Sequence, residues 1–134
     1  MPLTHHTALN DQFIAGLRLL RDDPAGARDL FKAILARDEH RPAAWMALSV
    51  ASRHARDGLG AMAAIERAVA LAPGHVAAQC IRAEIALELL DLSRAVAAIE
   101  ACIKADPSGA DPSGVRARSL LFLVKDQVAK MTQG

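Results

Sequence analysis

The side chains that could carry out chemistry are few in this sequence and lie far apart. Glu84 and Glu88 are four residues apart, a spacing at which two carboxylates share one helix face and could act as general acid and base. The same spacing is common on solvated helix faces, which is the interpretation we favour. Cys80 and Cys102 occupy apolar stretches and match no metal-binding or redox spacing. We therefore expect both cysteines to be small buried residues in a reducing compartment.

The five histidines do not indicate a metal site either. No two of them stand four residues apart on a helix, and no Cys-x-x-Cys is present. Glycine-rich phosphate loops and the Gly-x-Ser-x-Gly motif of hydrolases are also missing. The histidines are His5, His6, His40, His54 and His75. We therefore expect no catalytic residues, no metal, no cofactor and no enzyme activity in this chain.

The charge balance excludes several classes of partner. Sixteen basic residues nearly cancel fifteen acidic ones, and aromatic residues make up only 3%. A nucleic-acid site needs a basic track and stacking platforms, so we expect no nucleic-acid partner. There is no run of about 18 apolar residues and no signal-peptide pattern, so we expect no membrane partner and a cytoplasmic location. Arg outnumbers Lys by twelve to four, which is typical of a GC-rich bacterial genome.

The composition favours helices. Hydrophobic residues make up 52% of the 134 residues, and Ala rather than aromatic residues supplies much of this fraction. Ala has the highest helix propensity, whereas an all-β domain depends on β-branched and aromatic residues. High hydrophobicity with a net charge of +1 also excludes a disordered chain. We expect a single domain over residues 1–134.

Similar residues recur along the chain every 34 positions. Such a period indicates stacked copies of one structural unit. It divides the chain into units at about 8–41, 42–75 and 76–109, followed by a C-terminal segment. The recurring sets are Asp23, Asp57 and Asp91; Ala27, Ala61 and Ala95; Ala15, Ser49 and Ala83; and Phe31, Ile65 and Ile99.

Each unit has the pattern of two helices. In the middle unit, Trp45, Leu48 and Ser52 recur at spacings of three and four, as on one helix face. Pro42 suits the first turn of that helix, and Asp57 with Gly58 ends it. A second apolar set follows at Met62, Ile65 and Val69. Because no unit shows strand alternation, we predict an all-α fold of three antiparallel helical hairpins.

The C-terminal segment is predicted to be a helix at about 112–131. Asp111 is placed as its N-cap and Pro112 as its first residue, followed by an apolar stripe that includes Leu120 and Val124. Terminal units of a repeat array need a polar outer face, so we interpret this helix as a cap. The alternative is an amphipathic helix that docks on a membrane or on another protein. With the cap, the prediction is about seven helices.

These repeats resemble a tetratricopeptide-repeat (TPR) array. The middle unit carries the resemblance at Trp45, Leu48, Ser49, Ala61, Ile65, Ala68 and Pro73. The outer units depart from it, since Asp11 and Gln79 stand where the middle unit has Trp45. The resemblance covers about residues 8–109 and implies an α-solenoid with a TPR-like superhelical form. It also implies a concave groove, lined by the first helix of each hairpin, that holds a peptide or helix of a partner protein.

Carried over by position, the groove contains nine candidate partner-binding residues. Met46 and Val50 are expected to form an apolar strip beside Cys80, with polar groups along its edges. The alternative is that the first seven residues or the last helix fill this strip. The nine residues are Gln12, Met46, Val50, Arg53, His54, Cys80, Glu84, Leu87 and Glu88.

One subclass of TPR domains clamps the acidic tail of a chaperone through Lys, Asn and Arg on the inner helices. None of the corresponding positions in this chain is basic or Asn, so we expect no chaperone tail as partner. These positions are Gln12, Gly16, Ala47, Ala77 and Ile81. Two alternatives to a peptide-binding module stay open: a homo-oligomerisation unit such as a homodimer, and a scaffold module of a larger bacterial enzyme.

Overall fold

The computed structural model describes the backbone of residues 2–133 and the side chains of residues 8–133. Over this range the chain forms seven helices and no strand, which confirms the predicted all-α class. The helices group into two compact units, one up to Leu71 and one from Ala72 on. The single domain over 1–134, with its repeat boundaries, stays a prediction.

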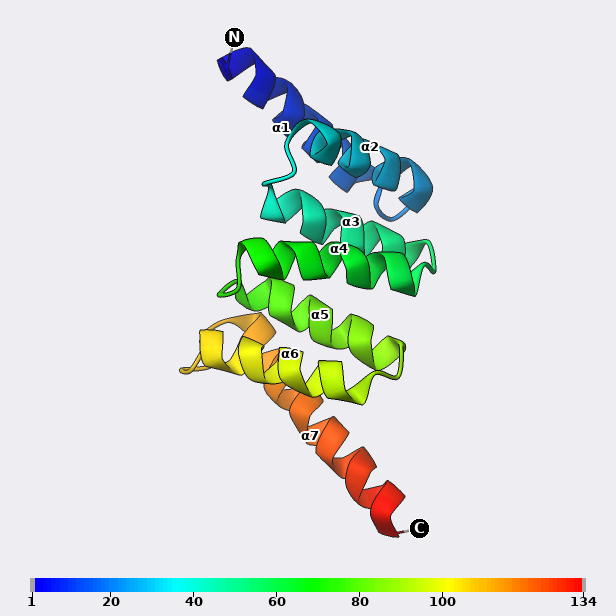
Figure 1. The fold of residues 1–134 in the computed structure, drawn as a ribbon, viewed down its shortest axis with the longest axis vertical. Coiled ribbons are helices and arrows are strands. Elements are labelled where there is room, and N and C mark those ends of the chain that lie inside the picture. The colour runs from blue at the N-terminus through cyan, green and yellow to red at the C-terminus, as the bar shows by residue number, and fades with distance from the viewer. Residues whose placement is uncertain (1, 134) are drawn as a thin grey trace. The chain divides into compact units, whose positions relative to one another are not determined.

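The first unit consists of two antiparallel hairpins (Figure 1). Along the chain, each helix of this unit packs against the next one. The first helix begins at Pro2, ahead of the expected start of the first repeat. The helices are α1 (Pro2–Leu19), α2 (Pro24–Arg37), α3 (Pro42–His54) and α4 (Gly58–Leu71).

The recurring aspartates are helix caps. The Oδ1 atoms of Asp23 and Asp57 each accept a hydrogen bond of 2.9 Å from the backbone N–H three residues further on, at the starts of α2 and α4. Asp91 makes the same contact at 3.1 Å in the second unit. An N-cap side chain of this kind stabilises a helix by about 1 kcal/mol. Part of the 34-residue period therefore marks where the second helix of each hairpin starts.

The residue before the capping aspartate has an unusual backbone in two of the three hairpins. Arg56 has φ +62° and Leu90 has φ +60°, and these residues are 34 positions apart. This left-handed region favours glycine, because a Cβ approaches the following carbonyl oxygen there. The tight turn between the two helices is therefore made at some cost in backbone strain.

Two of the recurring alanines are buried in the first unit. Ala27 and Ala61 are fully buried, and Phe31 is buried in the same core cluster as Ala27. The Phe31 ring packs against Phe13, with 5.8 Å between centroids. The two hairpins are also joined by an ion pair, because Nη2 of Arg28 lies 2.9 Å from Oδ2 of Asp57.

The second unit is one hairpin with a third helix packed on it (Figure 1). Its helices are α5 (Val76–Glu88), α6 (Leu92–Ala105) and α7 (Pro112–Gln133). Residues of all three helices form one core. The core residues are Cys80, Ala83, Ala98, Ile99, Cys102, Ala117, Leu120 and Val124.

A buried carboxylate fixes the start of α7. Asp106 is 6% exposed, and its oxygens accept hydrogen bonds of 3.1 Å from the N–H groups of Ala110 and Asp111. Arg118 pairs with the same carboxylate and donates a 2.7 Å bond to the Asp106 carbonyl oxygen. A Cβ at position 114 would collide with this carboxylate, so Gly114 is needed for the close approach. The predicted cap at Asp111 also forms, with Oδ1 accepting the Ser113 N–H at 2.8 Å.

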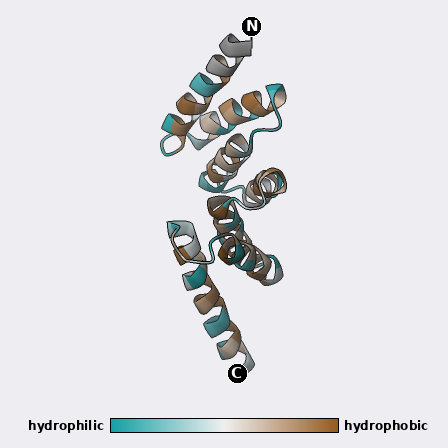
Figure 2. Ribbon diagram, turned by 90° about the vertical axis from the view of Figure 1, so that its left-hand side faces the viewer, coloured by the Kyte–Doolittle hydropathy of each residue, from teal (hydrophilic) through white to brown (hydrophobic). Residues whose placement is uncertain are grey.

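The last turns of α7 are exposed. After Val124, every described residue to the end of the helix is exposed. Polar and apolar turns alternate along the helix (Figure 2), and Phe122, Leu123 and Met131 are 72%, 59% and 64% exposed. A search of the described helices for one long and apolar enough to cross a bilayer finds none.

Candidate functional site

The nine predicted groove residues belong to two different units. Gln12 lies on α1, and Met46, Val50, Arg53 and His54 lie on α3. The remaining four lie on α5 of the second unit: Cys80, Glu84, Leu87 and Glu88. The expected contact between the strip on α3 and the face of α5 joins the two units and stays a prediction.

On α3, Met46 and Val50 form the apolar part of the predicted face. Both side chains are half-buried, and their spacing of four places them on one side of the helix. Arg53 is half-buried and His54 is exposed near the end of the helix. The opposite side of α3 is held in the core of the first unit, where Ala51 is fully buried. The helix therefore presents a fixed apolar strip with polar groups at one end.

A hollow of about 500 Å³ lies at that polar end. Its walls are His54 and the end of α1 with the turn that follows. Arg18 and Arg21 were not among the predicted site residues. The 34-residue period could have indicated this region, because it places Leu20 at the position equivalent to His54. The lining residues are Leu17, Arg18, Leu20, Arg21, Asp22 and His54.

On α1, the predicted groove residue Gln12 is half-buried, and the clamp position Gly16 is buried. The Oε1 atom of Gln12 has no hydrogen-bond partner among the described residues. Gly16 lies against the Phe31 ring, and a Cβ at this position would come within 2.5 Å of the ring atom Cε1. Position 16 thus has a packing reason to lack a side chain.

On α5, the side chain of Cys80 is buried. It is 4% exposed, and its Sγ donates a hydrogen bond of 3.5 Å to Oε1 of Glu84. Burial, with a further contribution from the Glu84 carboxylate, raises the pKa of the Cys80 thiol to about 12. Burial also raises the pKa of Cys102, whose Sγ donates to the carbonyl oxygen of Val76 at 3.3 Å. Both thiols are therefore protonated at neutral pH, as expected of buried structural cysteines.

Helix α7 supplies the partner for Glu84. Nε of Arg116 donates a 2.7 Å hydrogen bond to Oε1 of Glu84. This bond also holds the pKa of the Arg116 guanidinium above its usual range. Leu87 is half-buried against the core of the same unit, and Glu88 is exposed. In the second unit, therefore, α7 contacts part of the predicted groove face on α5.

The predicted face on α3 combines apolar side chains with polar groups at one end. Its apolar groups on α3 are the side chains of Met46 and Val50, which are half-buried on a fixed helix. A flexible thioether adapts to irregular apolar partners. Arg53 and His54 add hydrogen-bonding groups at one end of the strip.

The fold can be compared with known proteins. No family model matches the sequence, and no curated protein sequence matches it. Among solved structures, the Sgt2 TPR domain from Aspergillus fumigatus matches with a TM-score of 0.84 at 19% identity, over 95% of this chain and 83% of that one.

Two further matches are complexes with peptides. The first TPR of Spaghetti (RPAP3) bound to an HSP90 peptide matches with a TM-score of 0.79 at 17% identity, over 90% of this chain and 95% of that one. The Yersinia enterocolitica chaperone SycD in complex with a peptide of the translocator YopD matches with a TM-score of 0.81 at 13% identity, over the same shares of the two chains. The seven helices of residues 2–133, paired into hairpins with a further helix at the end, therefore have the fold of a tetratricopeptide-repeat domain.

Proposed function

We propose that this chain is a non-enzymatic protein-interaction module that binds a peptide or helix of a partner protein. The binding surface is the face formed by the first helices of the hairpins, and its anchor is the strip of Met46 and Val50 on α3. The observation that carries the proposal is this strip, which is apolar, half-buried and held by a packed helix. Buried apolar anchors dominate the energy of protein interfaces.

The similar structures support the same class of function. RPAP3 holds an HSP90 peptide and SycD holds a peptide of YopD, and both complexes are built on the fold of this chain. Those partners belong to those proteins. In this chain the positions of the chaperone clamp carry no basic residue and no Asn, and Gly16 and Ala47 among them are buried. We therefore infer a partner that relies on apolar side chains rather than an acidic chaperone tail, a nucleic acid or a membrane.

The location follows as part of the proposal. The Arg-rich composition and the two buried, protonated thiols support a bacterial protein that works in the cytoplasm. No cofactor is required for the proposed activity, because association needs only the apolar strip and its polar edge.

Selection of displayed random peptides on the immobilised protein tests the binding surface. The selected peptides are then titrated against the Met46→Glu and Val50→Glu variants, and we expect each variant to bind at least about tenfold more weakly. The control is Ala63→Glu, which adds the same charge at an exposed position of α4 and should bind as the unchanged protein does. If both α3 variants retain full affinity while their helical content is unchanged, the strip is not the binding surface.

A second candidate function is self-association through α7. The observation in its favour is the exposure of Phe122 and Leu123 on that helix. Sedimentation analysis over a range of protein concentrations tests it. A homodimer that dissociates in the Phe122→Asp variant supports this function, and a monomer at every concentration excludes it.

A further inference from the structure

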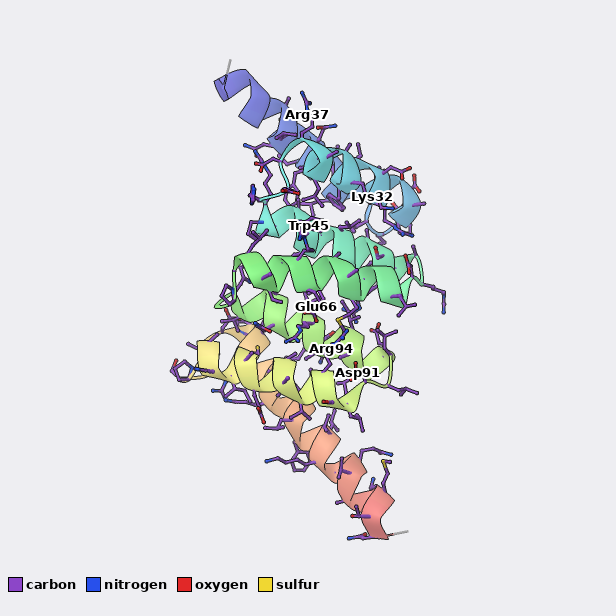
Figure 3. The ribbon with its side chains drawn as sticks, in the orientation of Figure 1. Lys32, Arg37, Trp45, Glu66, Asp91 and Arg94 are labelled. Carbon is purple, nitrogen blue, oxygen red and sulfur yellow. The ribbon has the colours of Figure 1, made fainter. Side chains whose placement is uncertain are left out.

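The first unit has a second hollow, which is built around Trp45. Its volume is about 380 Å³, and it lies between α2 and α4 with one side of α3 as its wall. Figure 3 shows Trp45 in this position, with Lys32 on the neighbouring helix α2. We call it the Trp45 hollow. It is lined by Lys32, Leu35, Ala36, Glu39, Trp45, Leu48 and Arg67.

The floor and wall of the Trp45 hollow are apolar and fixed. Leu35 and Leu48 are 8% and 6% exposed and belong to the core of the first unit. The half-buried indole of Trp45 is held in place because its Nε1 donates a 2.8 Å hydrogen bond to the carbonyl oxygen of Glu39. The hollow is therefore preorganised, and an incoming side chain does not have to order its walls.

The rim of the hollow is mainly basic. The guanidinium of Arg67 lies over the indole ring, 5.2 Å from the ring centroid. Its Nη2 is 3.8 Å from Oε2 of Glu39, while the Arg67 side chain is still 56% exposed. Lys32 is exposed on the other side of the opening. Two cations and one carboxylate thus surround an apolar floor.

This hollow is distinct from the face assigned to the proposed function. With 3.6 residues per turn, Trp45 and Leu48 share one side of α3, whereas Met46 and Val50 lie on another. None of the residues that line the Trp45 hollow is among the nine predicted groove residues. A ligand in the hollow would therefore leave the strip of Met46 and Val50 free.

We propose that the Trp45 hollow is a second peptide site, which takes one apolar side chain of an extended peptide with a carboxylate next to it. The apolar side chain packs on Leu35, Leu48 and the indole. The neighbouring carboxylate lies at the rim, where charge complementarity with Lys32 and Arg67 selects an acidic peptide over a basic one. A volume of about 380 Å³ lies within the usual range of ligand pockets. The chain would then hold two segments of one partner, or two partners, on different faces of one unit.

Fluorescence of the unchanged protein provides the test, because Trp45 is the only tryptophan in the sequence. The probe is the capped tripeptide acetyl-Glu-Leu-Glu-amide. Its matched controls carry Lys in place of both Glu residues, or Gly in place of Leu. We expect the Trp45 emission to change and to saturate with the acidic leucine peptide, at a lower concentration than with either control. An emission that does not respond at millimolar peptide, or that responds equally to all three peptides, overturns the proposal.

Substitutions of the rim cations test whether they cause the preference of the Trp45 hollow for acidic peptides. Lys32→Glu and Arg67→Gln should each weaken the binding of the acidic peptide about two- to fivefold, as expected for the loss of an exposed ion pair. Arg37→Glu is the matched control on α2, because Arg37 is exposed and does not line the hollow. Met46→Glu should leave this binding unchanged, which separates the Trp45 hollow from the proposed function. Equal binding by both rim variants and the Arg37→Glu control contradicts the proposed role of the rim cations.

Discussion

The inner faces of α3 and α5 occupy the same place in the repeat but have different surroundings. Met46 and Cys80 are 34 positions apart, as are Val50 and Glu84. In the first unit Met46 and Val50 are half-buried. In the second unit Cys80 is buried in a core that includes residues of α7, and Glu84 is bonded to Arg116. A position in the repeat therefore determines where a side chain lies on its helix, whereas the neighbouring helix determines whether a partner can reach it.

Removal of residues 112–134 should destabilise the second unit more than any other change proposed below. The truncation uncovers Cys80 and Cys102 and removes the buried side chains of Leu120 and Val124. We expect the second unit to lose about 4 kcal/mol, from about 2 kcal/mol for each of these side chains, and to unfold partly or aggregate. The measurements are thermal unfolding and the rate at which the two thiols react with a thiol reagent.

A shorter truncation is the control for this experiment. Removal of residues 126–133 takes away only exposed residues and should leave the stability of the second unit nearly unchanged. If the longer truncation is equally stable and its thiols stay protected, α7 does not cover α5 in solution.

High pH should destabilise the second unit, in which the thiol of Cys80 is buried. The pKa of Cys80 is raised from 9.0 to about 12 in the folded chain. The stability that the protonated, buried thiol contributes is therefore fully present below pH 9 and decreases above it. Above pH 9 the thiol ionises in the unfolded chain while it stays protonated in the folded one. We expect the free energy of unfolding to decrease by about 1 kcal/mol for each pH unit between these two values.

Urea unfolding at several pH values, with reductant present, measures this effect. The Cys80→Ala variant should lose less stability over the same pH range, because it lacks the thiol. A variant whose stability decreases as steeply as that of the unchanged protein would show that Cys80 is not shielded.

Loss of the Asp106 side chain, which holds the start of α7, should reduce stability by an intermediate amount. Asp106→Ala removes the acceptor of the Ala110 and Asp111 N–H groups and the partner of Arg118. Loss of a buried acceptor typically costs about 1–3 kcal/mol. The measurement is the free energy of urea unfolding, and Asp126→Ala, on the exposed part of α7, is the control. Equal stability of the two variants would contradict the role of Asp106.

Relief of backbone strain should give the smallest effect, with the opposite sign. Leu90 is 85% exposed and has a positive φ, so Leu90→Gly loses little packing and removes the strain of a Cβ in this region. We expect a gain of up to about 1 kcal/mol, reduced by the greater freedom of glycine in the unfolded chain. Arg56→Gly tests the equivalent turn of the first unit. A lower melting temperature in both variants would contradict the assigned backbone strain.

The fold was predictable because its determinants are local and repeated. Ala27, Ala61 and Ala95 recur at a fixed step, and all three are fully buried at helix contacts. Asp111 was predicted as a cap from its place before Pro112, and it does cap α7. Both kinds of signal depend on spacing along the chain, which a sequence shows directly.

The surroundings of the candidate site were harder to predict because they depend on contacts between distant residues. Glu84 and Arg116 are 32 positions apart, and the 34-residue period ends before α7 begins. Cys80 carried two predictions, a buried thiol and a groove residue. The structure buries it, and whether it also contributes to a groove stays a prediction. Trp45 marked the repeat, but nothing in its spacing indicated that Arg67 would lie over its ring.

Because Asp106 and Gly114 lie so close together, a substitution at one position changes the effect of a substitution at the other. A side chain at 114 collides with the carboxylate as long as Asp106 is present, and the loss of Asp106 removes the bonds that hold the start of α7. Single substitutions at either position are thus harmful, and their effects do not add, because the second relieves the collision of the first. Related sequences should keep the pair or replace both members, with position 106 changing before position 114. We therefore expect positions 106 and 114 to change together during evolution rather than independently.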